Sequence, residues 1–117
     1  MLKDFLVSHV FAKLPKGPKS FTLVSPAPKA RLTDPQPMLV WNTTPEATSW
    51  LIEVVLDSAF AEPVFTATLI RDATIVGKTA SIQCTTPLQS GQRYRWRVIA
   101  RNNYGSITSP SRAFRMQ

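Results

Sequence analysis

The sequence has little of what catalytic and metal sites are built from. It holds one histidine, one cysteine and only four glycines in 117 residues. His9 lies outside the region that we expect to fold, so the predicted domain lacks the base of a Ser-His-Asp or Cys-His nucleophile. A single cysteine excludes an internal disulfide and a metal site with several thiolates, and we interpret Cys84 as a small buried apolar residue. Patterns for a phosphate-binding loop, a dinucleotide fold, a calcium loop and a zinc site are also missing. The sequence therefore predicts a non-enzymatic protein with no cofactor and no metal site.

Acidic residues are also scarce. There are seven, and no spacing among them marks a pair for acid–base catalysis, so we interpret them as surface carboxylates. They are Asp4, Asp34, Glu46, Glu53, Asp57, Glu62 and Asp72. Fourteen basic residues outnumber them and give a net charge of +7. This excess favours anionic partners such as nucleic acid, acidic polysaccharide or an anionic membrane surface. The alternative is a solubilising charge with no partner, because the basic residues are spread along the chain.

Long apolar runs are missing as well. No stretch approaches the roughly 18 residues of a membrane span, and residues 1–14 lack the clean apolar core and cleavage site of a signal peptide. Those residues could form a short amphipathic helix, the tail of a preceding domain or a strand. Residues 14–20 are rich in proline, glycine and lysine, which is typical of an extended linker. We therefore divide the chain into an N-terminal extension, 1–19, and one folded domain, 20–117.

That domain contains seven candidate strands separated by turn residues, which predicts an all-β sandwich. They span residues 21–25, 38–42, 48–57, 63–71, 79–85, 92–102 and 107–116. The sixth is the most regular, because Tyr94, Trp96, Val98 and Ala100 recur at period two. We expect these four side chains to face the core. Arginine occupies four of the positions that point outward: Arg93, Arg95, Arg97 and Arg101.

The domain resembles a fibronectin type III domain over about 97 of the 117 residues. The matching residues are Trp41, Trp50 and the spaced series Leu88, Gly91, Tyr94, Trp96, Val98, Ala100, Asn102 and Gly105. The resemblance implies a seven-stranded antiparallel, immunoglobulin-like sandwich with a structural core that includes Trp41, Trp50, Leu88, Tyr94, Trp96 and Val98. It also implies a corner at Leu88 and Tyr94, where the tyrosine hydroxyl bonds to nearby backbone. Asn102 and Gly105 would shape the turn into the last strand.

A subgroup within this family is also indicated. The segment Asp57-Ser58-Ala59-Phe60 after the third expected strand, together with Phe114 in the last, resembles variants found in large bacterial extracellular proteins. The Arg-Gly-Asp sequence of vertebrate adhesion domains is missing. The sequence Asn42-Thr43-Thr44 matches a glycosylation site, and we interpret it as a chance match at a strand end.

The outward arginines suggest a partner face. In the sandwich that the resemblance implies, the third and seventh strands flank the sixth, and Arg112 and Arg115 would extend the set on the seventh. The proposed face therefore combines arginines with the outward residues of the third strand, and apolar area rimmed by arginine is typical of interaction surfaces. Its members are Leu51, Glu53, Val55, Arg93, Arg95, Arg97 and Arg101, with Ile99 beside them. The alternative is cross-strand neutralisation, with Arg95 or Arg97 opposite Glu53 or Asp57.

Several functions remain open. The leading interpretation is a non-catalytic module of a larger extracellular or cell-surface protein, acting as a spacer, adhesion or carbohydrate-associated domain. The second is a protein-binding module that docks a partner or a neighbouring domain through its arginine-rich face. A phage structural protein is a third. Nucleic acid is the weakest partner, because the aromatic residues alternate inward and only Tyr104, at a loop tip, could stack on a base.

Overall fold

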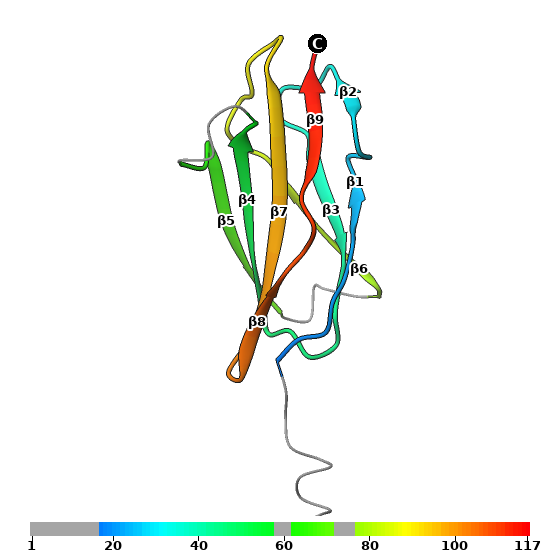
Figure 1. The fold of residues 1–117 in the computed structure, drawn as a ribbon, viewed down its shortest axis with the longest axis vertical. Coiled ribbons are helices and arrows are strands. Elements are labelled where there is room, and N and C mark those ends of the chain that lie inside the picture. The colour runs from blue at the N-terminus through cyan, green and yellow to red at the C-terminus, as the bar shows by residue number, and fades with distance from the viewer. Residues whose placement is uncertain (1–16, 58–61, 72–76) are drawn as a thin grey trace, which may run out of the picture.

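A computed structural model describes residues 17–57, 62–71 and 77–117, and these form an all-β chain without helices (Figure 1). The strands are β1 (Leu23–Ser25), β2 (Ala30–Leu32), β3 (Met38–Asn42), β4 (Ser49–Leu56), β5 (Phe65–Ile70), β6 (Thr79–Gln83), β7 (Arg93–Asn102), β8 (Gly105–Thr108) and β9 (Arg112–Met116). The all-β class predicted from the sequence is confirmed. Within the described ranges the chain forms no helical segment that could serve as a membrane span.

The strands form two sheets. The smaller has the order β1-β3-β6, and the larger has the order β2-β9-β7-β4-β5, with β8 also paired to β7. Every pairing is antiparallel except β2 with β9, which is parallel. The sixth expected strand, now β7, lies between the third (β4) and the last (β9), as the sequence analysis expected.

The described residues contain nine strands where the sequence predicted seven, and prolines explain the difference. Proline lacks a backbone N–H and fixes φ, so it interrupts a strand ladder. Pro26 and Pro28 end β1, which is paired with β3 in the small sheet. The chain then crosses to the large sheet, where it forms β2 beside β9. Pro110 divides the expected last strand into β8 and β9.

The core lies between the two sheets. Along β7 the burial alternates, so that Tyr94, Trp96, Val98 and Ala100 are buried. Trp41 in β3 and Trp50 in β4 contact each other across the two sheets, with ring centroids 6.4 Å apart. Buried apolar residues from every strand except β2 and β8 complete the cluster. They include Leu23, Leu39, Ile52, Val54, Phe65, Ala80, Phe114 and Met116.

The N–H groups of the three buried tryptophans have no partners within the described part of the chain, although a buried indole N–H usually finds one. Among the described residues, the Nε1 atoms of Trp41, Trp50 and Trp96 have no hydrogen-bond acceptor. A buried donor without a partner costs about 1–3 kcal/mol. Burying a tryptophan ring removes about 150–250 Å² from water, which stabilises by about 4–6 kcal/mol. Burial of the ring therefore outweighs the unpaired N–H.

Tyr94 forms the corner that the resemblance implied. Its side chain is 3 % exposed and stacks on Phe114, with ring centroids 5.8 Å apart. The backbone N–H of Gln89 donates to the Tyr94 hydroxyl at 2.8 Å. Leu88 is buried beneath this turn, and Gly91 follows with a φ of 80°, a conformation that glycine adopts without strain.

The turn from β7 into β8 is held by Asn102. Its Oδ1 accepts the N–H of Tyr104 at 2.8 Å, and its Nδ2 donates to the carbonyl of Glu46 at 3.1 Å. Asn102 and Gly105 are paired at the base of the two-residue turn. Tyr104 itself is 63 % exposed at the tip.

The two ends of the described chain lie at opposite ends of β7 (Figure 1). Gly17 lies beside the β7–β8 turn, so close to Gly105 that a Cβ added to Gly17 would come within 3.5 Å of the Gly105 Cα. At the other end, Met116 and Gln117 are bonded to Gln92 and Leu32. Ten residues of β7 separate these ends, which corresponds to roughly 30 Å at the usual rise per strand residue. The chain thus runs in at one end of the long axis and out at the other.

Candidate functional site: the outer face of the six-stranded sheet

The outer face of the six-stranded sheet carries the residues that the sequence marked as a partner face. In the register of β4 with β7, Val55 lies opposite Arg95, Glu53 opposite Arg97 and Leu51 opposite Ile99. Arg101 lies opposite Ser49 at the far end of the same pair. The two strands therefore bring the predicted residues onto one surface.

Ion pairs neutralise the β4 side of this face. Arg97 Nε lies 2.9 Å from Glu53 Oε1 directly across the strands. Asp57 receives two arginines, with Arg95 Nε at 2.9 Å and Arg93 Nε at 3.1 Å from its carboxylate oxygens. Cross-strand neutralisation, the alternative in the sequence analysis, is therefore present. The carboxylates are half-buried and the arginines more exposed, and surface pairs stabilise a fold by about 0–1 kcal/mol each, so these pairs shape the surface more than they hold it together.

The apolar part of the predicted face is smaller than expected. Leu51, Val55 and Ile99 are all half-buried, and none belongs to the exposed large apolar residues of the described chain. A hollow of about 310 Å³ lies between Glu53, Arg95 and Arg97. This side of the sheet offers paired charges rather than an apolar patch rimmed by free arginines.

Arg112 does not belong to the outward set, which corrects the sequence analysis. Residues three apart on a strand face opposite sides. Arg112 is on the side of buried Phe114, and its Nη1 donates to the carbonyls of Val24 at 3.0 Å and Pro26 at 3.3 Å. It thereby ties β9 to the segment where the chain crosses between sheets. Arg115, in contrast, is exposed on the outer face.

Two further cations, Lys29 and Arg31, were missed by the sequence analysis. β2 has only three residues and lies in a proline-rich segment, and no strand was predicted there. Basic and apolar residues alternate in Lys29-Ala30-Arg31-Leu32, but this run is too short to indicate a strand by itself. Pairing of β2 with β9 sets Arg31 opposite Arg115, and pairing of β7 with β9 sets Arg93 opposite Arg115.

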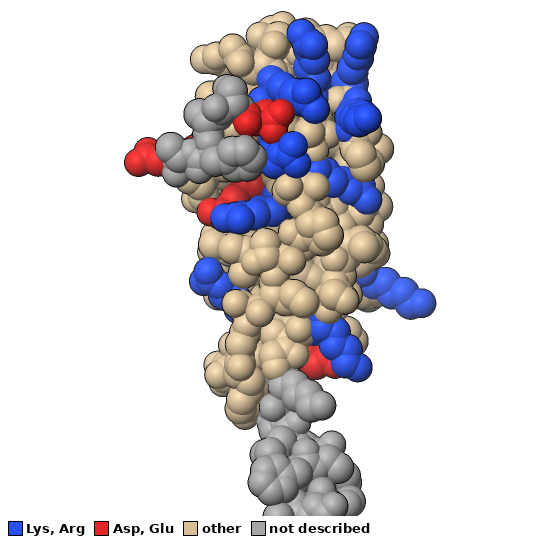
Figure 2. Space-filling view, in the orientation of Figure 1, with Lys and Arg blue, Asp and Glu red and all other residues tan. Residues whose placement is uncertain are grey.

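These cations gather over β2, β9 and the start of β7. We call this region the basic surface and define it as Lys29, Arg31, Arg93, Arg95 and Arg115. Figure 2 shows the basic side chains crowded on this side, with the acidic groups displaced toward β4. Asp57 is the one carboxylate among the described residues that is ion-paired to any of the five. Five cations against one anion leave a formal excess of four positive charges.

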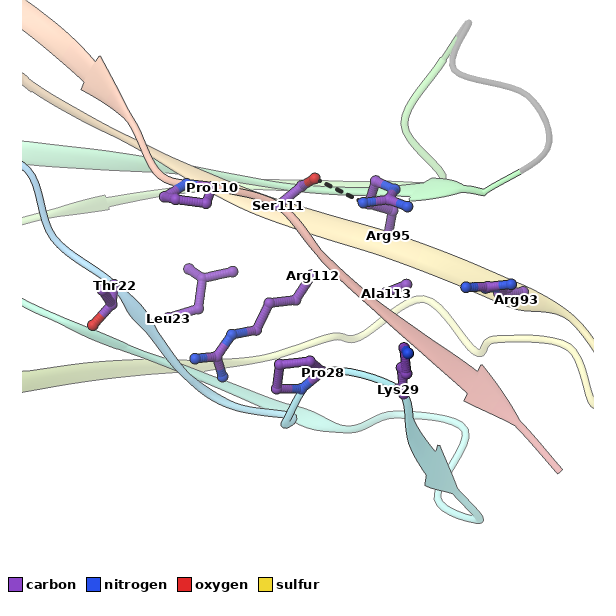
Figure 3. A pocket seen from close by; sticks show the side chains of 10 residues that line it. All are labelled: Thr22, Leu23, Pro28, Lys29, Arg93, Arg95, Pro110, Ser111, Arg112 and Ala113. Atoms are coloured by element: carbon purple, nitrogen blue, oxygen red, sulfur yellow. Dashed lines mark hydrogen bonds between the residues drawn. The ribbon is translucent and has the colours of Figure 1, made fainter.

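The basic surface is hollowed. A cavity of about 380 Å³ opens where the chain crosses between sheets, with Lys29, Arg93 and Arg95 on its rim (Figure 3). Its other lining residues are Thr22, Leu23, Pro28, Pro110, Ser111, Arg112 and Ala113. A second hollow of about 360 Å³ adjoins it and shares Lys29, Arg93 and Ala113. Arg95 is held at the rim by a bond to the Ser111 hydroxyl, 3.1 Å from Nη1.

Arg71 is a structural cation that sequence reasoning also missed. Its Nε and Nη2 each donate at 2.7 Å, to the carbonyls of Ala47 and Thr44. Its guanidinium carbon lies 4.9 Å from the centre of the Trp50 ring. Arg71 therefore fastens the β3–β4 connection to the end of β5 and places its charge over the Trp50 ring.

The remaining chemical groups are occupied. Cys84 is buried, and burial raises the pKa of its thiol, although a bond from Sγ to the Thr86 carbonyl at 3.4 Å opposes the shift. The Nδ2 of Asn42, the atom to which a glycan would be attached in the glycosylation match, donates a hydrogen bond to the Thr22 hydroxyl at 2.7 Å. Across the ranges that the structure describes, no group of three His, Cys, Asp or Glu side chains could hold a metal ion. His9 and Ser58–Phe60 of the subgroup match lie outside those ranges.

A scan against protein-family models finds no matching family, and a search of curated proteins finds no similar sequence.

Proposed function

We propose that this chain is a non-catalytic β-sandwich module of the fibronectin type III type within a larger extracellular or cell-surface protein, where it serves as a spacer, adhesion or carbohydrate-associated domain. The observation that carries the proposal is the Tyr94 corner, in which the hydroxyl takes the Gln89 N–H at 2.8 Å. The placement of β7 between β4 and β9 supports it, because the same arrangement was expected from the resemblance.

The spacer role is supported by the positions of the chain ends. Gly17 and Gln117 lie at opposite ends of the sheet, roughly 30 Å apart by the length of β7. Modules joined through such ends line up head to tail, so each one adds its long axis to the length of the parent protein. A module with adjacent ends would instead hang beside its neighbours.

A tandem of two complete chains joined end to end tests this role. Small-angle scattering should give a maximum dimension that exceeds that of one chain by at least roughly 30 Å, the length of one module. A single chain measured alongside is the control. If the two copies fold side by side, and the maximum dimension stays close to that of one copy, the spacer role is wrong.

Docking of a partner or neighbouring domain is the second candidate, and the charge distribution favours it. The β4 side of the outer face is neutralised by Glu53 and Asp57, whereas Arg31 and Arg115 have no ion-paired carboxylate among the described residues. A charge excess confined to one part of a surface favours one region for a negatively charged partner. We therefore place the docking face on the basic surface over β2, β9 and β7, which shares Arg93 and Arg95 with the face that the sequence analysis proposed.

A further inference from the structure

Three arginines lie abreast on the basic surface. Arg31, Arg115 and Arg93 occupy opposing positions on the neighbouring strands β2, β9 and β7, and all three are exposed on the outer face. Side chains opposite one another in a sheet start about 4.5–5.5 Å apart, and like charges in such positions destabilise the pairing. Of these three arginines, Arg93 is the one that is ion-paired to Asp57, which reduces its repulsion from the others. The row is therefore arranged so that an anion lying across it relieves repulsion between Arg31 and Arg115.

We propose that the basic surface binds an acidic, extended segment of a partner protein, with carboxylates on the Arg31–Arg115 row and an apolar side chain in the adjoining cavity. The inference rests on the docking role above and names the chemistry of its partner. Three strands span about 10 Å, and an extended peptide presents side chains to one face about every 6.8 Å. A few residues of such a segment cover both the row and the cavity.

The surface already displays the contact that a carboxylate would make. Asp57 sits between Arg93 Nε at 3.1 Å and Arg95 Nε at 2.9 Å, so one carboxylate takes two guanidinium groups. Four of the five cations of the basic surface are arginines, whose planar fork matches a carboxylate in a bidentate arrangement. A partner carboxylate between Arg31 and Arg115 would likewise take two guanidinium groups, in this case from the neighbouring strands β2 and β9.

The cavity favours a polypeptide over other polyanions. Its walls include Leu23, Pro28, Pro110 and Ala113 beside the cations, so it offers an apolar contact next to the charges (Figure 3). Glycans and single-stranded nucleic acids usually gain affinity by stacking on exposed aromatic rings. Among the described residues the exposed ring is Tyr104, which lies at the opposite end of β7. An acidic segment with an interspersed apolar side chain fits both features.

Binding of a labelled peptide to the full chain tests the proposal. The probe is a short dye-labelled peptide of alternating glutamates and leucines, compared with a version in which glutamines replace the glutamates. The test variant is Arg31→Glu with Arg115→Glu. The matched control is Lys78→Glu with Arg101→Glu, which changes the net charge equally at exposed positions outside the basic surface. Thermal unfolding of both variants verifies that they fold.

Fluorescence anisotropy at about 0.15 M salt, where charges are screened beyond about 8 Å, should show binding of the glutamate peptide only. We expect the test variant to weaken it by at least about tenfold and the control by less than about twofold. Equal weakening by both variants would overturn the site, because it would reveal generic charge attraction. A sulfated oligosaccharide or DNA that depends on Arg31 and Arg115 while the peptide does not bind would overturn the partner class and leave the docking role. No binding by any probe would overturn both and leave the spacer role standing.

Discussion

Replacing Tyr94 by phenylalanine removes one atom, the hydroxyl that accepts the Gln89 N–H at 2.8 Å. The ring stays in place, because its stacking on Phe114 needs no hydroxyl. A neutral hydrogen bond contributes about 0.5–1.5 kcal/mol, and an unpaired buried donor costs up to about 3 kcal/mol. Gln89 is exposed as a residue, so water reaches its N–H in part and the lower range applies. We expect Tyr94→Phe to lower the free energy of unfolding by about 1 kcal/mol.

Urea unfolding followed by tryptophan fluorescence measures this loss. Tyr104→Phe is the matched control, because Tyr104 is 63 % exposed and should change stability by less than about 0.5 kcal/mol. The midpoint should fall at an unchanged denaturant slope, and the melting temperature should drop by about 4–8 °C. If Tyr94→Phe is no more destabilising than Tyr104→Phe, the corner does not stabilise the fold. The proposed family assignment would then lose the observation on which it mainly rests.

Three further predictions follow from the core and its edges. Trp96→Ala should lower the free energy of unfolding by about 3–5 kcal/mol in the same urea assay, and a loss below about 1.5 kcal/mol would contradict the central place of this ring. Arg71→Lys should cost about 1–3 kcal/mol, because an ammonium cannot make both 2.7 Å bonds to Ala47 and Thr44 in one planar fork; a neutral result would contradict its fastening role. Burial raises the pKa of the Cys84 thiol, so as the pH rises the thiol loses its proton in the unfolded chain before it does so in the folded chain. The thiol's contribution to the free energy of unfolding is therefore complete below about pH 8.5 and is lost as the pH rises toward the folded pKa. The unfolding free energy should therefore fall less steeply above about pH 8.5 in Cys84→Ala than in the parent chain, and equal slopes would count against the shift.

The fold could be predicted where one strand's side chains alternate clearly. In residues 93–101 and 49–55 buried side chains alternate with half-buried or exposed ones, and the period-two sequence pattern predicts the buried side. β2 could not be predicted this way, because three residues are too few for a pattern and the strand depends on its pairing with β9. The split at Pro110 was readable in principle, since a proline within a strand pattern argues for an interruption.

The candidate site was predictable only in part, because its charge balance depends on register. Period two placed Arg93, Arg95 and Arg97 outward, but one strand's sequence does not specify which acids lie opposite. The sequence named Glu53 and Asp57 as possible partners of Arg95 and Arg97, but which arginine meets which acid, and that Asp57 takes two, follows only from the alignment of β4 with β7. The row of Arg31, Arg115 and Arg93 joins segments far apart in the chain, which no local pattern connects.

The outer face of the larger sheet divides into a neutralised side over β4 and a basic side over β2, β9 and the start of β7. An amide-resolved NMR titration of the full chain with the glutamate–leucine peptide tests it most directly. We expect shifts at residues 29–32, 93–95 and 112–116 that persist at about 0.3 M salt, where generic attraction is screened over shorter distances. Residues 49–53 and 97–101 should stay unchanged, because their charges are already paired or lie beyond the basic surface. Shifts spread evenly over both sides, or shifts that vanish with salt, would contradict the claim.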